Sequence, residues 1–391
     1  MWRRIELRNY RSIETARVDL APFTVLIGPN GSGKSNFADA FVFISELPDA
    51  SNAVARRGGI AGMQRWQQPP HHELFFDLRV SDSKEHLDTT YIHYQGALQV
   101  DQGKHWSFQG ERFEVIERGA STTQLKRSEN GDVQITADGV TLPLLAGHSS
   151  LMLLAKQLLT LSKGKNASVP AQGARRYRLN PDAMRQPHPD SDASHLNESG
   201  SNIAEAIQNL REQKDGSFED VIDSMTRIVP GLVDIGTPKV GHFRMLEFRQ
   251  QQMAGGIASF SPMEMSDGAL RALGILVAAR QVDAESLLII EEPEVNLHPG
   301  ATAVLFEALK QASQRGAVLI TTHSPELLDA AKDEEILVCD YRSGVTRIGP
   351  LAAEQRQVVR DGLFSVAELM RTTSLRIEGD EPAALAPPTT P

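Results

Sequence analysis

The chain has 391 residues, 40% of them hydrophobic, and a formal net charge of −10 at pH 7. This length predicts a large core with at least one additional lobe. The acidic balance argues against a generally basic surface for nucleic acid but leaves a local basic patch open. The pairs Arg56-Arg57 and Arg175-Arg176 are more typical of a solvated face than of a nucleic-acid patch.

Cysteine usage and the apolar segments bear on the compartment. A single cysteine, Cys339, excludes an internal disulfide and is typical of a reducing cytoplasm. The chain starts with an alternating strand pattern instead of an apolar signal sequence. Its longest apolar stretch, Leu142 to Leu161, contains His148 and Lys156, which a membrane span would rarely carry. We therefore expect a cytoplasmic protein with no membrane association, in which this stretch forms a buried or dimer-facing helix.

The first predicted elements surround a glycine-rich loop. Residues Arg3 to Leu7 and Ala16 to Leu20 alternate like paired strands, and Phe23 to Ile27 form an apolar run typical of a buried strand. A helix is predicted from Ser35 to Glu46. Between strand and helix, residues 28–35 read Gly-Pro-Asn-Gly-Ser-Gly-Lys-Ser, which fits the G-x-x-x-x-G-K-S phosphate-binding pattern.

The residue types in this loop suit a nucleoside triphosphate. Glycines permit backbone angles that turn successive N–H groups toward phosphate oxygens, and the helix N-terminus adds partial positive charge. Lys34 is expected to reach the β- and γ-phosphates, and the Ser35 hydroxyl to ligate Mg²⁺. A turn that merely needs glycines is the weaker alternative, because the lysine, the serine and the flanking strand and helix are all present. The residues expected to bind ATP here are Asn30, Gly31, Ser32, Gly33, Lys34, Ser35 and Asn36.

The middle of the chain changes character several times. Strands are predicted at residues 75–80, 90–95, 112–117, 232–235 and 244–249. Helices are predicted at 144–162, 202–213 and 218–228, and a polar loop at 163–200. The segment 163–200 is rich in Pro, Ser, Asp and Asn, and we expect a long mobile loop there. Residues 378–391 are rich in Pro, Ala and Thr and are expected to be disordered.

A second set of candidate residues follows an apolar strand at Leu287 to Ile290. Glu291 and Glu292 end this strand, and two carboxylates at the mouth of a buried strand are costly unless they are used. Opposite a phosphate-binding loop, Glu291 is expected to hold Mg²⁺ through water, and Glu292 to orient or deprotonate the attacking water. A strand end that simply emerges into solvent is the alternative.

Two further motifs are weaker when taken alone. The apolar strand at Val318 to Thr322 ends in His323, which is expected to sense the γ-phosphate; a structural histidine is the alternative. The tripeptide Ser266-Asp267-Gly268 begins an apolar helix that runs to about Val282. It either supplies the N-cap of that helix or presents free N–H groups to a phosphate.

Together these residues carry a family resemblance. The sequences Asn9-Tyr10-Arg11-Ser12, GPNGSGKS, SDG before a helix, EEPEVNLHP and TTHSPE resemble those of ABC-class ATPases of the RecF, SMC and Rad50 kind. They are most similar to the standalone group that includes the overcoming-lysogenization-defect (OLD) phage-defence ATPases. The resemblance covers residues 1–80 and 232–340, with weaker similarity at 178–181 and 200–203. It implies an α/β fold, namely an ABC-type P-loop NTPase head with a mixed sheet, helices and an inserted helical arm.

The resemblance also implies a division of the chain. Residues 1–140 would form the N-terminal part of the head, and 141–231 an inserted, mainly helical arm or dimerisation subdomain. Residues 232–350 would form the C-terminal part of the head, and 351–391 a C-terminal extension.

In such ATPases two heads pair head-to-tail, and each nucleotide lies between one P-loop and the signature helix of the other subunit. Carried over to this chain, Ser266, Asp267 and Gly268 would contact the γ-phosphate held by the other subunit's Lys34. Asn296 to His298 would form the loop that crosses between subunits. The tripeptide SDG differs from the SGG of transporters and SMC heads.

The resemblance assigns the remaining site residues as well. Glu292 would be the catalytic carboxylate and His323 the switch histidine, while Arg11 matches an N-terminal arginine that approaches the nucleotide phosphates. Gln64 is the candidate for the lid-loop glutamine beside the metal.

Two functional hypotheses follow. The residues after His323 contain no D-x-D pair, so we expect no nuclease domain there and expect any nuclease or toxin effector to be a separate protein. The first hypothesis is a slow, regulated ATPase that acts as the sensor subunit of an anti-phage defence system with such an effector. The alternative is a DNA-binding ATPase of RecF or SMC type in DNA repair or maintenance. Both imply a homodimer or a higher homo-oligomer. A transporter ATPase or a small-molecule kinase is disfavoured, because neither an LSGGQ-like signature nor an acceptor-site signal is present.

Overall fold

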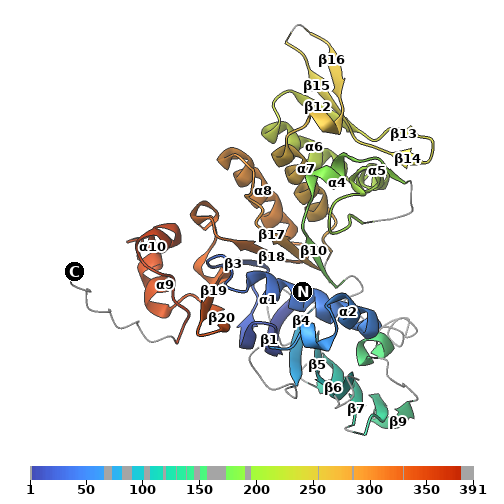
Figure 1. Cartoon of the computed structure of the whole chain (residues 1–391), viewed down its shortest axis with the longest axis vertical. Helices are drawn as coiled ribbons and strands as arrows, with labels where there is room; N and C mark the ends of the chain where they lie inside the picture. Colours follow the sequence, from blue (N-terminus) through green and yellow to red (C-terminus); the bar gives the residue numbers. More distant parts are fainter. Residues whose placement is uncertain are drawn as a thin grey trace.

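The computed structural model describes residues 2–65, 73–81, 90–100, 106–117, 120–128, 130–137, 139–144, 150–155, 173–189, 195–253, 255–283, 286–328 and 330–379. Within these residues a single 14-stranded sheet forms the body of the molecule (Figure 1). Helices and two small sheets gather beside one end of it, and antiparallel strands extend from the other end.

The strands of the large sheet come from both halves of the chain. They are β1 (Trp2–Tyr10), β2 (Ile13–Asp19), β3 (Phe23–Ile27), β4 (Leu74–Ser81), β5 (Thr90–Val100), β6 (Trp106–Glu117), β7 (Ala120–Arg127), β8 (Val133–Ala137), β9 (Val140–Leu144), β10 (Ala174–Tyr177), β17 (Leu287–Glu291), β18 (Ala317–Thr322), β19 (Ile336–Arg342) and β20 (Val345–Pro350). Their spatial order is β10-β17-β18-β3-β19-β20-β2-β1-β4-β5-β6-β7-β8-β9.

The first five strands in this order run parallel to one another. Thr322 of β18 lies opposite Ile27 of β3, and Glu291 of β17 lies opposite Thr321 of β18. Parallel strands bring their carboxyl ends to the same edge of a sheet, which is where ligands bind in open α/β sheets. The residues after β3, β17 and β18 therefore meet at one edge, although more than 250 residues of sequence separate Ser35 from Glu291.

The structure also contains helices and two small sheets beside the large sheet. The helices are α1 (Lys34–Glu46), α2 (Ala50–Arg56), α4 (Pro181–Arg185), α5 (Ile203–Gln213), α6 (Ser217–Ile228), α7 (Asp267–Arg280), α8 (Pro299–Ala312), α9 (Ala353–Arg360) and α10 (Val366–Thr372). The small sheets consist of β11 (His188–Pro189), β14 (Phe243–Arg244) and β13 (Lys239–Val240), and of β12 (Leu232–Gly236), β15 (Glu247–Gln251) and β16 (Ile257–Phe260). Short 3₁₀ turns occupy Leu47–Asp49, Ile60–Gly62, Pro262–Glu264, Pro325–Leu327 and Asp333–Glu335.

The apolar strands are buried on both faces, which explains why they read as continuous apolar runs. Leu287 and Ile289 of β17 pack into the core that contains α1, whereas Leu288 and Ile290 pack into the core that contains α5–α8. Burying each such side chain contributes about 1.5–3 kcal/mol relative to leaving it exposed. The parallel strands thus form a rigid support for the residues at their carboxyl ends.

The expected α/β fold with a mixed sheet is confirmed, as are the strands and helices around the P-loop and at 202–213 and 218–228. The expected long loop at 163–200 is wrong for its described part, because β10 and α4 lie there and β10 pairs with β17. Four residues with two arginines give no recognisable strand pattern, and the parallel partner supplies the pairing. Residues 163–172 and 190–194 lie outside the described residues.

One other expectation is met only in part. The helix predicted at 144–162 overlaps the end of β9, and helical structure is described at 151–155. Residues 145–149 and 156–162 lie outside the described part, as do residues 380–391 of the tail that was expected to be disordered. No described helix is both long and apolar enough to cross a membrane.

Candidate nucleotide-binding site

The glycine-rich loop connects β3 to α1, as its sequence predicts. Gly31 and Gly33 have φ angles of 77° and 106°, in the left-handed region that favours glycine. Gly28 is required for a different reason, namely space. A Cβ atom at Gly28 would lie 2.0 Å from the carbonyl oxygen of Cys339 on β19. Gly28 does not have a positive φ, so the backbone freedom expected of the loop glycines is used by Gly31 and Gly33 but not by Gly28.

Lys34 is held inside this loop. Its side chain is buried, and its Nζ donates hydrogen bonds to the carbonyl oxygens of Gly28 at 2.7 Å and Pro29 at 3.1 Å. Burial lowers the pKa of Lys34, and nearby Cys339 and Glu292 act in the opposite direction. A buried ammonium whose described acceptors are neutral carbonyls is a cation that a phosphate would stabilise.

Ser35 and Glu291 meet at the carboxyl edge of the sheet. The Ser35 hydroxyl donates a hydrogen bond of 2.5 Å to Glu291 Oε2. The hydroxyl comes from the first turn of α1, and the carboxylate from the last residue of β17. Hydroxyl and carboxylate oxygens are ligands that Mg²⁺ prefers, so this pair fits a magnesium ion that keeps several water ligands. The described residues contain no cluster of three or more His, Cys, Asp or Glu that could hold a metal by protein ligands alone.

Glu292 and His323 lie together one residue beyond their strands. His323 Nδ1 is 3.4 Å from Glu292 Oε1, and both side chains are partly exposed, by 43% and 37%. Glu292 has a left-handed φ of 50°, and its N–H donates to the carbonyl oxygen of Thr321 at 2.8 Å. This backbone turn directs Glu292 differently from Glu291, so the two neighbouring carboxylates have separate partners.

Arg11 lies beside the first turn of α1. Its guanidinium contacts the Asn36 side-chain oxygen at 3.4 Å and Asp39 Oδ2 at 3.0 Å. Asn36 in turn donates to the Ser12 hydroxyl at 2.7 Å. The Asn9-Tyr10-Arg11-Ser12 turn is thereby joined to the first turn of α1, and the expected approach of Arg11 to the nucleotide phosphates stays a prediction.

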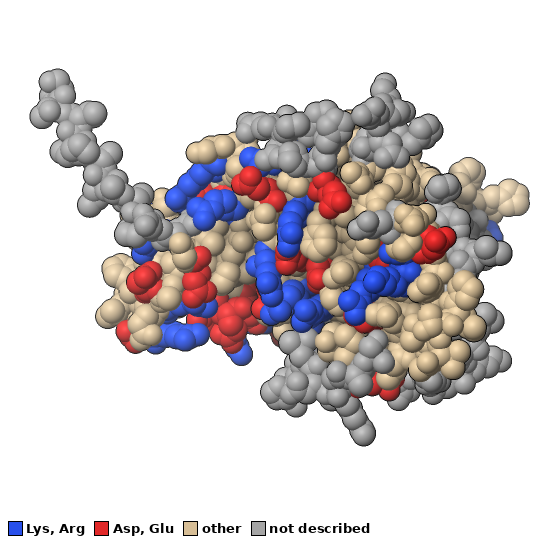
Figure 2. All heavy atoms as spheres, turned by 90° about the horizontal axis from the view of Figure 1, so that it is seen from below, with Lys and Arg blue, Asp and Glu red and all other residues tan. Residues whose placement is uncertain are grey.

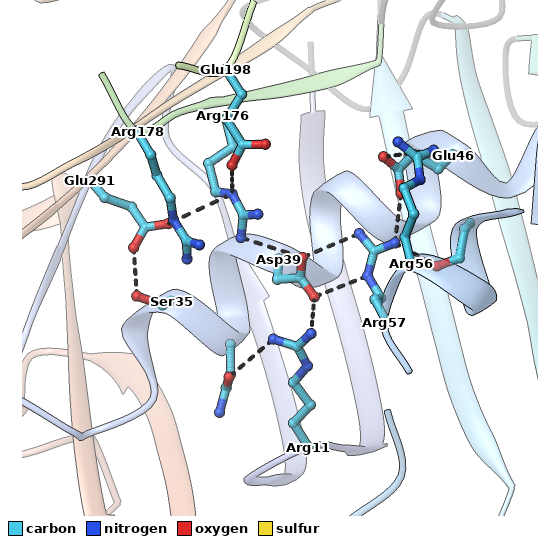
Figure 3. A network of polar contacts seen from close by, with 12 residues as sticks. Arg11, Ser35, Asp39, Glu46, Arg56, Arg57, Arg176, Arg178, Glu198 and Glu291 are labelled. Atoms are coloured by element: carbon cyan, nitrogen blue, oxygen red, sulfur yellow. Dashed lines mark hydrogen bonds and ion pairs between the residues drawn. The ribbon is translucent and has the colours of Figure 1, made fainter. Parts of the chain in front are cut away.

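A buried carboxylate, Asp39, organises the charges around α1, and the sequence analysis missed it. Figure 3 shows three arginines converging on it: Arg57 at 3.0 Å, Arg11 at 3.0 Å and Arg176 at 3.3 Å. The Tyr10 hydroxyl donates to it as well, at 2.5 Å. Burial favours the neutral acid, but Arg57 and the other donors hold the pKa of Asp39 below its ordinary value.

The solvated faces that we expected at the two arginine pairs hold for Arg56, whose side chain is 56% exposed, but not for Arg57 and Arg176. The side chains of Arg57 and Arg176 are only 6% and 12% exposed. Arg57 directly follows α2 and Arg176 lies in β10, and the sequence carries no local signal that either residue meets Asp39 of α1. Arg178, which follows β10, also reaches the site, because its Nε donates to Glu291 Oε1 at 3.0 Å.

The Ser266-Asp267-Gly268 segment begins α7, as predicted. The Ser266 side chain accepts a hydrogen bond from the Ala269 N–H at 3.2 Å and so caps the helix. Ser266 and Asp267 are exposed, whereas Gly268 is buried against the loop after Glu292, where an added Cβ would lie 2.3 Å from the Asn296 carbonyl oxygen. The start of α7 and the predicted subunit-crossing loop are therefore neighbours.

Arg271 joins α7 to the carboxyl edge of the parallel strands. Its guanidinium donates to the Glu292 carbonyl oxygen at 3.3 Å and to the Leu179 carbonyl oxygen at 3.2 Å. Burial lowers the pKa of Arg271, with Glu292 acting against it. This residue was not singled out from the sequence, since one arginine inside an apolar helix carries no pattern.

Gln64 lies in another part of the site. It forms a β-bridge with Tyr10, next to Arg11. Its assignment as the lid-loop glutamine at the metal stays a prediction. The structure instead brings Arg178 to the carboxylate that the metal would use.

Two sequence families match the chain. Residues 1–136 match the family described as "AAA ATPase domain". Residues 154–329 match the family described as "AAA domain, putative AbiEii toxin, Type IV TA system". The first match contains the P-loop, and the second contains the start of α7, the two glutamates and His323.

Known proteins agree with these matches. The Old nuclease of Escherichia phage P2 is 22% identical over 369 residues, which cover 87% of this chain and 59% of that protein. The OLD nuclease of Thermus scotoductus is 23% identical over 355 residues, covering 86% and 61%. The chain therefore spans about three fifths of the length of these relatives.

Solved structures show the same fold. An Smc head bound to the C-terminal winged-helix domain of ScpA matches with a TM-score of 0.56 at 14% identity, over 90% of this chain and 99% of that one. A second Smc head, with ScpA from Pyrococcus furiosus, matches with a TM-score of 0.51. Two parts of the chain thus match AAA ATPase-domain families, most of the chain is similar in sequence to two OLD nucleases, and its fold is that of SMC heads.

We predict that Asp39→Asn lowers the free energy of unfolding by about 3–5 kcal/mol, because it leaves buried guanidinium groups without their shared anion. Urea unfolding measures this loss. Because the folded-state pKa of Asp39 is lowered, its ionised form contributes stability above its ordinary pKa, and this is lost as pH falls through the lowered value. Asp39→Asn should therefore weaken the acid dependence of stability as well.

Asp19→Asn is the matched control. Asp19 also pairs with an arginine, Arg4, but its side chain is 69% exposed, so the loss should stay below about 1 kcal/mol. Similar small losses in both variants would show that Asp39 does not have the structural role assigned to it.

Proposed function

We propose that this ABC-type ATPase binds ATP with Mg²⁺ between the loop 28–35 and Glu291–Glu292, and hydrolyses it. The observation that carries the proposal is the position of Lys34, a buried cation with carbonyl acceptors beside the Ser35–Glu291 pair. Loop N–H groups, the α1 N-terminus and Lys34 would hold the phosphates. No other described region combines these features with a pair of carboxylates at a strand end.

The chain's own residues divide the chemistry. Ser35 and Glu291 would hold the magnesium ion, which when bound neutralises charge on the phosphate oxygens. Glu292 is placed to accept a proton from the attacking water, since its carboxylate is partly exposed at the same edge. His323, 3.4 Å from that carboxylate, would orient it and sense the terminal phosphate.

We further propose that two chains pair head-to-tail to complete each site. Ser266 and Asp267 are exposed at the start of α7, a helix of 14 residues, and so are available to a second subunit. The adjoining loop at Asn296 approaches Gly268 closely, so both segments would reach the partner together. The SMC-head fold supports this arrangement.

The biological role that we propose is that of an ATPase and sensor subunit in anti-phage defence, acting with a separate nuclease or toxin effector. The similarity to OLD nucleases covers 86–87% of this chain but only 59–61% of those proteins. We take the part of those proteins that aligns with this chain to be their ATPase part, because both family models that match this chain describe AAA domains.

A DNA-binding ATPase of RecF or SMC type is the second candidate, favoured by the SMC-head fold. Figure 2 shows Lys and Arg in short clusters interspersed with Asp and Glu on the face seen from below, without one extended basic surface in that view.

Steady-state ATP turnover with and without DNA separates the candidates. We expect slow turnover that DNA does not change; strong stimulation by DNA would favour the second candidate instead.

We predict that Glu292→Gln binds ATP but hydrolyses it at least ~100-fold more slowly, because the amide cannot accept the proton of the attacking water. Turnover assays and binding of a fluorescent ATP analogue measure the two effects. Glu307→Gln, at an exposed carboxylate on α8 that pairs with Arg227, is the control and should keep full turnover. Full turnover by Glu292→Gln would refute the catalytic assignment.

Mixing two inactive variants tests the composite site. Lys34→Ala removes the phosphate-binding cation, and the double variant Ser266→Ala/Asp267→Ala removes the contacts expected from the partner. In a head-to-tail heterodimer one site carries both defects and the other carries neither, so mixing should restore activity. No recovery on mixing, together with monomers by sedimentation in the presence of ATP, would contradict the composite site.

A further inference from the structure

Glu291 has two sets of partners, and one of them is cationic. Its Oε2 accepts the hydrogen bond from Ser35, whereas its Oε1 accepts one from Arg178 Nε at 3.0 Å (Figure 3). Arg176 Nε lies 3.7 Å from the same Oε1. The carboxylate that would serve the metal is therefore already paired with guanidinium groups.

The two arginines differ in how firmly they are held. Arg176 is 12% exposed and also pairs with Asp39 at 3.3 Å and Glu198 at 3.1 Å. Arg178 is 51% exposed and follows the last residue of β10. Because residues i and i+2 of an extended chain point to the same side, both guanidinium groups face Glu291, but Arg178 has more freedom to move.

The pairing opposes the binding of a divalent cation. A cation beside Glu291 would lie next to the Arg178 guanidinium, and like charges at such distances repel. Phosphate oxygens, in contrast, are strong bidentate acceptors for arginine, and P-loop NTPases use an arginine supplied in cis or in trans to stabilise charge at the terminal phosphate.

We propose that Arg178 exchanges partners when nucleotide binds. In the nucleotide-free chain it holds Glu291, and with a bound nucleoside triphosphate it contacts the terminal phosphate in cis, which frees Glu291 for the metal. Arg178 is then a residue that distinguishes a triphosphate from a diphosphate. This inference rests on the proposed function, because it requires ATP in the loop 28–35.

The segment after β10 is placed to transmit this exchange. The carbonyl oxygen of Leu179, next to Arg178, accepts a hydrogen bond from Arg271 of α7, which also donates to the Glu292 carbonyl oxygen. Farther along, Arg185 of α4 pairs with Asp267 at 2.6 Å, at the start of α7. Movement at Arg178 therefore acts on the backbone contacts of both the catalytic glutamate and the helix that would face the partner.

The test uses Arg178→Gln, Arg178→Lys and the control Arg227→Ala in the full-length chain. Arg227 is an arginine of similar exposure, 56%, with a carboxylate partner at 2.9 Å on the surface. One measurement is Mn²⁺ affinity without nucleotide, read by electron paramagnetic resonance. The other is the ratio of affinities for fluorescent ATP and ADP analogues, and melting temperatures check that each variant is folded.

We expect opposite changes in the two measurements. Arg178→Gln should bind Mn²⁺ about tenfold more tightly, because the competing cation is gone, and should lose about tenfold in its preference for ATP over ADP, because a charged phosphate contact is lost. Arg178→Lys should recover part of the ATP preference, since lysine keeps the positive charge but cannot donate two parallel hydrogen bonds as a planar guanidinium does. Arg227→Ala should change neither value.

Other outcomes overturn the proposal. If Arg178→Gln leaves both values unchanged, or lowers the Mn²⁺, ATP and ADP affinities alike, Arg178 has no exchanging role. If the unaltered chain binds no nucleotide, the proposed function fails, and the phosphate half of this inference fails with it. The Mn²⁺ measurement needs no nucleotide, so it still reports whether Arg178 competes with a metal at Glu291.

Discussion

The hydrogen bond between Ser35 and Glu291 joins the phosphate-binding loop to the strand that carries the two glutamates, where ATP hydrolysis is expected. It exists because β3 and β17 both belong to the parallel part of the large mixed sheet, with β18 between them. Each strand is buried on both faces, so its carboxyl end cannot shift without disturbing two cores. The relative position of P-loop and glutamates is therefore set by packing and not by the loops themselves.

A second constraint is that several charged side chains near the carboxyl edge of the sheet are largely shielded from solvent and must pair with one another. Asp39 provides one shared anion for Arg11, Arg57 and Arg176, and Glu291 provides another for Arg176 and Arg178. Buried ion pairs rarely add net stability, but removing one member is costly because its partner stays buried and uncompensated. Such a network suits a site that must remain poised until an anionic ligand arrives and changes the pairing.

Local patterns predicted one part of this site and could not predict the other. A few neighbouring residues are enough to indicate the loop 28–35, the glutamates after β17 and His323 after β18. The parallel strands bring these segments together. Strand β10 has no such signal, since its pairing with β17 spans more than a hundred residues. Arg57 and Arg176 belong to arginine pairs that resemble surface pairs, because nothing in their local sequence indicates that they share the buried anion Asp39, which is 18 and 137 residues away.

A contact between residues far apart in sequence also explains why Gly28 is required. Its sequence context suggests a need for backbone freedom, whereas the constraint comes from Cys339, a residue near the other end of the chain. Arg271 and Arg178 belong to this class as well, because each acts through carbonyl or carboxylate groups that only the folded sheet brings near. Long-range juxtaposition, and not residue type, decides what these positions do.

The central claim is that one magnesium–ATP binds between the loop 28–35 and the glutamates at the end of β17. A crystal structure of Glu292→Gln grown with saturating ATP and Mg²⁺ tests it most directly. The account predicts phosphates against the loop N–H groups, Lys34 Nζ moved from the Gly28 and Pro29 carbonyls to phosphate oxygens, and a metal between Ser35 and Glu291. A nucleotide bound elsewhere, or Lys34 still paired with those carbonyls and no phosphate in the loop, would contradict it.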